Sequence, residues 1–136
     1  MRPSSVMRVL PIVLGLALGW VSSAQGATPA EILAGYKAQG GGTPSAERGQ
    51  KFFTTNFGKQ MGWSCSSCHG DNPMKPGKDD VSGKRIDPLA PAAQASRFTD
   101  KVKVENSLRL NCKDVVGREC TAAEKADVLA WLMSLK

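Results

Sequence analysis

Apolar residues recur at helical spacing in four stretches of the chain, and each stretch begins with residues that cap a helix. The first follows a capping box at 28–31, in which a proline occupies the first helical position. Ile32, Leu33 and Tyr36 then lie on one side of the predicted helix, which ends at the glycines 40–42. This pattern predicts an N-terminal helix that packs on the rest of the domain.

A second helix is predicted over residues 44–57, with Thr43 as its N-cap and a proline in its first position. It contains Gly49, and a glycine inside a helix costs about 1 kcal/mol relative to alanine. We expect this glycine to lie where another helix crosses at close range. Phe52 and Phe53 should face the same crossing.

Two further helices are predicted in the C-terminal half. One covers about 100–110 and is capped by Thr99 or Asp100. Its inward stripe has i, i+4, i+7 spacing and consists of Val104, Leu108 and Asn111. The other opens at a capping box over 121–124, and its apolar stripe consists of Val128, Trp131, Leu132 and Leu135. Helices therefore dominate the predicted fold.

Residues 71–95 show no convincing periodicity and predict a long loop. The stretch is punctuated by residues that favour turns, namely Pro73, Pro76, Gly77, Gly83, Pro88 and Pro91. A loop of this length in a small domain is usually functional or wrapped around something.

The chemistry of the chain is concentrated between the second helix and this loop, at Cys65, Cys68 and His69. Two cysteines three residues apart, followed directly by a histidine, form the attachment motif of a c-type haem. The thiols add to the two vinyl groups, and the histidine becomes the proximal iron ligand. His69 is the only histidine of the chain. A structural disulfide or a thioredoxin-like motif is the alternative, but the latter needs a strand–helix context that is absent from the predicted elements.

The order of these features resembles the start of a class I cytochrome c. A helix that carries Glu47, Gly49, Phe52 and Phe53 precedes the Cys-x-x-Cys-His-Gly motif. The resemblance implies an all-α fold, with helices packed around one covalently bound haem c. It also implies that the last helix crosses the helix of Gly49 with Trp131 against that glycine, and that a carbonyl near Pro88 accepts a hydrogen bond from His69.

Residues 1–24 are predicted to be a cleaved signal peptide and 25–136 a single haem domain. Arg2 and Arg8 precede an apolar run of about thirteen residues, and Ser22 and Ala24 supply small residues for cleavage. The alternative, a retained membrane anchor, would need about 20 apolar residues. We therefore expect a periplasmic protein that is not held in a membrane.

Export also bears on the two remaining cysteines, Cys112 and Cys120. In an oxidising compartment such a pair forms a disulfide by default.

With 6% aromatic residues and 14 glycines, the protein core alone would be thin, so the porphyrin should supply much of it.

The full sequence has a net charge of +6. No basic stretch is interleaved with aromatic residues, so nucleic acid is not an expected partner. The positive charge suits either docking of a protein with an acidic face or an ordinary solvated surface.

The second axial ligand of the haem cannot be the usual distal methionine. Between Met74 and Met133 there is no methionine, and Met61 and Met74 lie too near the proximal segment. Asn111, Lys113 or an open position remain. A lysine must first lose a proton that it holds strongly. Asn111 lies on the inward stripe, which favours a ligand. The alternative is that it caps the C-terminal end of the helix, where asparagine is common.

The C-terminal half carries three more groups of characteristic residues: Gly83-Lys84-x-Ile86-x-Pro88-Leu89-Ala90-Pro91, then Arg97-Phe98-Thr99-Asp100, and Asn111-Cys112 with Gly117-Arg118-x-Cys120-Thr121. With these groups, the chain from about residue 28 to 135 resembles the oxygen-binding monohaem cytochromes c of the sphaeroides haem protein family. The resemblance implies haem ligation by His69 and Asn111, with Asn111 leaving on reduction so that O₂, NO or CO binds. It also implies a disulfide between Cys112 and Cys120 beside the distal pocket, and a dihaem cytochrome c as electron donor.

Three functions follow as hypotheses. The first is a redox-linked binder of diatomic gas that another cytochrome reduces. The second is a low-potential periplasmic electron carrier without physiological gas binding. The third is an enzyme that reduces O₂, NO or a related small oxidant, which would call for a helper such as Arg97 or Arg109 in the pocket.

Overall fold

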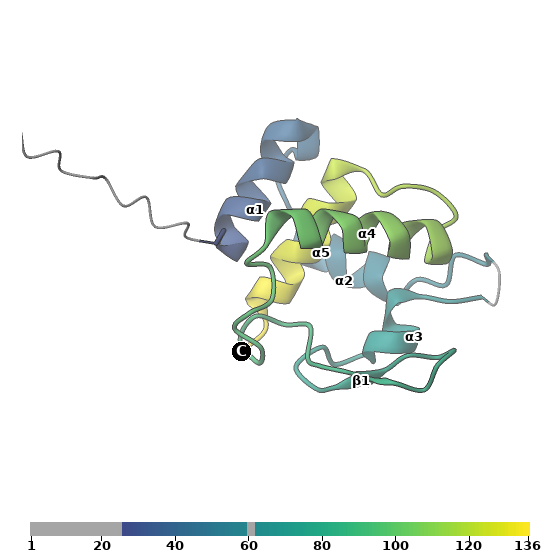
Figure 1. Cartoon of the computed structure of the whole chain (residues 1–136). Coiled ribbons are helices and arrows are strands. Elements are labelled where there is room, and N and C mark those ends of the chain that lie inside the picture. The colour runs from purple at the N-terminus through teal and green to yellow at the C-terminus, as the bar shows by residue number, and fades with distance from the viewer. Residues whose placement is uncertain (1–25, 60–61) are drawn as a thin grey trace, which may run out of the picture.

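The computed structural model describes residues 26–59 and 62–136 (Figure 1). In this part of the chain there are α-helices, one wide helical turn and a hairpin of two-residue strands, which confirms the predicted all-α class. The elements are α1 (Pro29–Tyr36), η1 (Lys37–Gly41), α2 (Ala46–Thr54), α3 (Cys65–His69), β1 (Gly77–Lys78), β2 (Arg85–Ile86), α4 (Lys101–Val115) and α5 (Ala122–Ser134). The predicted signal peptide and Met61 lie outside the described residues.

The start of α2 differs from the prediction: its N-cap is Ser45 and not Thr43. The hydroxyl of Ser45 accepts a hydrogen bond from the Arg48 amide at 3.2 Å. The carboxylate of Asp127 on α5 accepts one from the Ser45 amide at 2.6 Å and binds the Arg48 guanidinium at 2.7 Å. A contact with a distant helix therefore decides where α2 begins, because it supplies the partner of the Ser45 amide.

The helix α4 begins after Asp100 as predicted but continues to Val115, five residues beyond the expected end. No strong helix breaker occurs before Gly117, which has a φ of +81°. Asn111 consequently lies inside the helix, so its interpretation as a C-terminal cap is wrong. The capping boxes at Thr28 and Thr121 are confirmed, each with its glutamate three residues on.

The helices α2 and α5 cross at Gly49, as the sequence predicted. A β-carbon at Gly49 would lie 2.0 Å from the carbonyl oxygen of Asp127, so only a glycine allows this approach. The atoms nearest to this glycine belong to the backbone of Asp127 and Val128 and not to Trp131, the partner that the resemblance implied. Trp131 lies one turn further along α5 and packs on Phe53, with 5.0 Å between the ring centroids.

The long loop packs below α4 in Figure 1, together with α3 and the hairpin. Its strands pair antiparallel, Gly77 opposite Ile86. Further along, the amides of Leu89 and Ala90 both donate to the carbonyl of Pro73, at 2.9 and 3.1 Å. The loop is thus tied to itself and leaves a space between α3 and α4.

Candidate functional site

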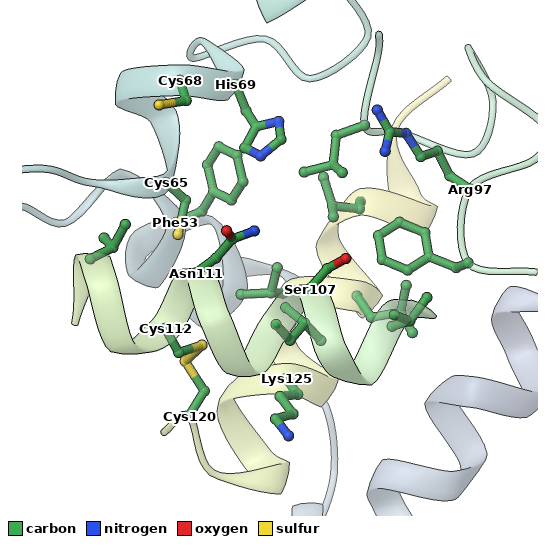
Figure 2. A pocket seen from close by; sticks show the side chains of 18 of the residues that line it. Phe53, Cys65, Cys68, His69, Arg97, Ser107, Asn111, Cys112, Cys120 and Lys125 are labelled. Atoms are coloured by element: carbon green, nitrogen blue, oxygen red, sulfur yellow. A yellow bond between two sulfur atoms is a disulfide. The ribbon is translucent and has the colours of Figure 1, made fainter. Parts of the chain in front are cut away.

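A cavity of ≈ 460 Å³ lies between α3 and α4, and Figure 2 shows α3 on one side of it and α4 on the other. This volume is typical of ligand and cofactor sites. Its walls are largely apolar and include Phe53, Leu89, Phe98, Val104, Leu108, Val128, Leu129 and Leu132. Polar and charged side chains also line the cavity, and they come from both sides.

The short helix α3 brings Cys65, Cys68 and His69 to one edge of the cavity. It begins in a capping box in which Ser64 and Ser67 each bond the backbone amide of the other. Burial raises the pKa of the Cys65 thiol to about 11, so this cysteine is a protonated thiol at neutral pH. Cys65 and Cys68 are both free thiols, which is what haem attachment requires and what a structural disulfide between them would not leave.

The backbone of α3 lies so close to β1 that there is no space for a side chain at Gly77. A β-carbon at Gly77 of β1 would lie 2.1 Å from the Cys68 carbonyl oxygen and 2.9 Å from the His69 α-carbon. The hairpin therefore lies directly against the turn that carries the motif and fixes its position.

Burial, and then the positive charge of Arg97, lower the pKa of His69. The ring is thus neutral at physiological pH and retains the lone pair that an iron ligand needs. Its centroid lies 6.1 Å from that of Phe53. Phe53 therefore links the imidazole to Trp131 and the α2–α5 core.

Arg97 lies at the opposite end of the cavity from the cysteines (Figure 2). Its guanidinium donates to the carbonyl of Pro88 at 2.8 Å and to that of Asp87 at 2.7 Å. A carbonyl near Pro88 was expected to accept a hydrogen bond from His69. Among the hydrogen bonds of the described residues none involves the His69 ring, and the Pro88 carbonyl accepts from Arg97. Arg97 therefore fixes the loop that passes His69, a role that could not be assigned from the sequence.

Asn111 projects into the cavity from α4, on the side opposite His69 (Figure 2). Val104, Ser107 and Leu108 line the cavity from the same helix. Lys113 does not line it, because its ammonium pairs with Glu119 at 3.3 Å on the surface. Of the two side chains considered as second axial ligand, only Asn111 is directed at the site.

In the structure, Cys112 and Cys120 are joined by a disulfide, at the positions where the sequence led us to expect one. Both cysteines are buried and pack with Val116 against Phe52 and Phe57. The bond joins α4, at the residue after Asn111, to the residue before the N-cap of α5. The distal wall is therefore covalently held at the end that carries Asn111.

The site fits a haem c in its chemistry. A porphyrin carries its vinyl groups and its propionates at opposite edges. The cavity has two free thiols at one edge and Arg97 at the other, with Lys103 also in its lining and apolar walls between. His69 and Asn111 supply one nitrogen donor and one amide from opposite sides.

Two features of the site were not expected from the sequence: the backbone conformation of Phe98 and the place of Ser107 in the cavity lining. Phe98 is the one non-glycine residue of the described chain with a positive φ, at 58°, and its side chain packs on two core clusters. A phenylalanine rarely adopts this conformation, so no sequence pattern indicates it. Ser107 is a single hydroxyl on a polar helix and was not singled out.

Comparisons with known proteins agree with this geometry. Residues 39–132 match a family model described as a domain of unknown function, DUF1924. The chain is 44% identical over 123 residues to the cytochrome c-type protein SHP of Cereibacter sphaeroides, which covers 89% of this chain and 95% of that protein. It is 42% identical over 95 residues to cytochrome c'' of Methylophilus methylotrophus, with 67% and 65% covered.

Two solved structures share the fold. The structure of oxidised SHP, described as an oxygen-binding cytochrome c, superposes with a TM-score of 0.76 at 45% identity and covers 81% of this chain and 99% of that one. Oxidised cytochrome c'' from Methylophilus methylotrophus gives a TM-score of 0.72 at 35% identity, with 79% and 94% covered. The expected cytochrome c fold and the resemblance noted in the sequence are confirmed. The chain carries one covalently bound haem c and belongs to the SHP family of cytochromes c.

Proposed function

We propose that this protein is a periplasmic monohaem cytochrome whose ferrous haem binds a diatomic gas such as O₂, NO or CO. Cys65 and Cys68 hold the haem, His69 is the proximal ligand, and Asn111 is a distal ligand that leaves on reduction. The observation that carries the proposal is the position of Asn111, which projects into the cavity from the side opposite His69. The description of oxidised SHP as an oxygen-binding cytochrome c supports the gas.

Each residue has a distinct task in this function. The bound haem supplies an iron that alternates between ferric and ferrous states. The neutral imidazole of His69 is a strong nitrogen donor, whereas the Asn111 amide offers a weak oxygen donor that suits the harder ferric state better than the ferrous state.

The remaining parts of the proposal concern location and electron supply. Residues 1–24 direct export, and a dihaem cytochrome c reduces the protein. The disulfide Cys112–Cys120 limits how far Asn111 moves when it leaves. Within residues 26–59 and 62–136, none of the helices combines the length and apolar character needed to cross a bilayer.

The test compares Asn111→Ala with wild type by optical spectroscopy of the ferric, ferrous and ferrous-plus-CO forms. We expect wild-type protein to be six-coordinate when ferric and five-coordinate, high-spin when ferrous, because only the ferric state retains the weak amide donor. Asn111→Ala should open the ferric site to water or added anions and leave ferrous CO binding largely intact.

Asn106→Ala is the matched control, since Asn106 is exposed on α4 and does not line the cavity. It should leave all three spectra unchanged. A ferrous spectrum of wild type that is six-coordinate, low-spin and resistant to CO would contradict gas binding and favour the electron carrier.

A further inference from the structure

Ser107 lies one helical turn before Asn111 on the inward face of α4. Residues four apart on a helix are separated by about 6 Å along its axis and have neighbouring side chains. Both residues line the cavity, and both are directed into it in Figure 2. The two side chains are therefore neighbours on the wall of the cavity.

The hydroxyl of Ser107 is not used by the protein backbone. Elsewhere in the chain such hydroxyls bond a carbonyl of the preceding turn: Thr54 to Gln50 at 3.0 Å, Thr55 to Lys51 at 2.6 Å and Ser134 to Trp131 at 2.6 Å. Among the hydrogen bonds of the described residues, none involves the Ser107 side chain. It is a free donor and acceptor on the wall of the site.

A haem in this cavity would cover both side chains and remove them from water. Buried polar groups are nearly always hydrogen-bonded, and an unpaired one is costly. While Asn111 occupies the axial position, its Oδ1 is satisfied there. Once it has left, Oδ1 needs a new donor inside the cavity.

We propose that Ser107 is that donor: its hydroxyl takes up the Asn111 amide oxygen when the amide is off the axial position. Ser107 is thus a positioning residue that favours the detached state. The inference rests on the proposed role of Asn111 as a ligand that leaves on reduction. It adds a reason why the Asn111 amide does not return to the axial position after reduction.

The proposal predicts a specific change in reduction potential. Removing the hydroxyl destabilises the ferrous state, in which Asn111 is detached, but not the ferric state, in which it is attached. Loss of one neutral hydrogen bond should shift the equilibrium by about fivefold. For a one-electron couple this lowers the potential by about 40 mV, at 59 mV per tenfold.

The experiment is a redox titration of holoprotein carrying Ser107→Ala, Ser107→Thr and Asn106→Ala. Ser107→Ala should lower the potential as stated, whereas Ser107→Thr keeps a hydroxyl and should remain near wild type. Asn106→Ala changes the neighbouring exposed residue and should have no effect. CO affinity of the ferrous form should not change in Ser107→Ala, because Asn111 is detached both before and after CO binds.

The same titration in an Asn111→Ala background completes the cycle. There the effect of Ser107→Ala should disappear, since no amide remains to be taken up. An unchanged or raised potential in Ser107→Ala, or a shift that persists without Asn111, would overturn the inference alone. An Asn111→Ala variant with unaltered ferric spectra would overturn it together with the proposed function.

Discussion

Gly49 lies at the crossing of α2 and α5, the two helices that support the side of the site that carries His69. Its missing side chain lets the backbone of α2 approach that of α5 at Asp127 and Val128. The carboxylate of Asp127 then bonds the Ser45 amide and the Arg48 guanidinium across the same crossing. One absent methyl group and one buried carboxylate thus set how α2, with Phe53, faces the cavity.

Gly49→Ala should destabilise the protein by about 1–3 kcal/mol, since the added methyl group meets backbone atoms that cannot turn aside. Chemical denaturation of the holoprotein measures this. Gly35→Ala in α1 is the matched control, because a β-carbon there meets nothing within 4 Å. It should stabilise the protein by up to about 1 kcal/mol through helix propensity. Equal effects at both positions would contradict the close crossing.

On the scale of elements, α4 is held at both ends. Near its start, Glu105 accepts a hydrogen bond from the Tyr36 hydroxyl of α1 at 2.9 Å and pairs with Lys125 of α5. Near its end, the disulfide joins it to the residue before the cap of α5. Burial by itself raises the pKa of Glu105, but the hydrogen bonds from Lys125 and Tyr36 outweigh it and lower the pKa below 4.5.

Glu105→Gln should therefore reduce stability in a pH-dependent way. The folded-state pKa of Glu105 is lowered, so the stabilisation is fully present above about pH 4.5 and is lost as the pH falls through the lower folded value. Thermal midpoints of wild type and variant, measured from pH 7 to pH 3, should converge at the acidic end. Glu47→Gln on the exposed side of α2 should behave like wild type throughout. A difference that grows on acidification would be inconsistent with this pairing.

For the whole molecule, the cavity between α3 and α4 means that the cofactor is part of the core. Without haem, the apolar side chains that line this space of ≈ 460 Å³ would face water, and the stabilisation that comes from burying them would be lost. The net stability of a domain is about 5–15 kcal/mol. The protein without haem would consequently have little stability left.

The variant that lacks both attachment cysteines, Cys65→Ala with Cys68→Ala, tests this. We expect it to lose covalent haem and most of its helical circular dichroism at room temperature. Asn111→Ala, which keeps both thiols, is the control and should stay folded. Recovery of a compact, haem-free helical domain with a cooperative thermal transition would show that the cofactor is not required for the core.

Much of this arrangement could be predicted from the sequence because local rules decide it. The capping boxes at Thr28 and Thr121 and the haem motif are all set by neighbouring residues. The predictions were wrong where residues far away in the sequence determine the local structure. Asp127 determines the start of α2, and the partner of Gly49 depends on which turn of α5 meets it. Arg97 bonds carbonyls nine and ten residues away, which no periodicity reveals.

The covalent and ionic attachment of α4 has a consequence for competition at the proposed site. An amide on a helix held at both ends acts as an internal competitor at a fixed effective concentration, independent of the amount of protein. In the proposed ferric state, an external anion would have to compete with this effective concentration of the amide, so solutes at low concentration would be excluded from the site. In the proposed function, reduction releases the amide, and the site is then open to a gas at low concentration. Which ligands can bind would thus depend on the redox state, and this dependence would follow from the attachment of α4 at both ends.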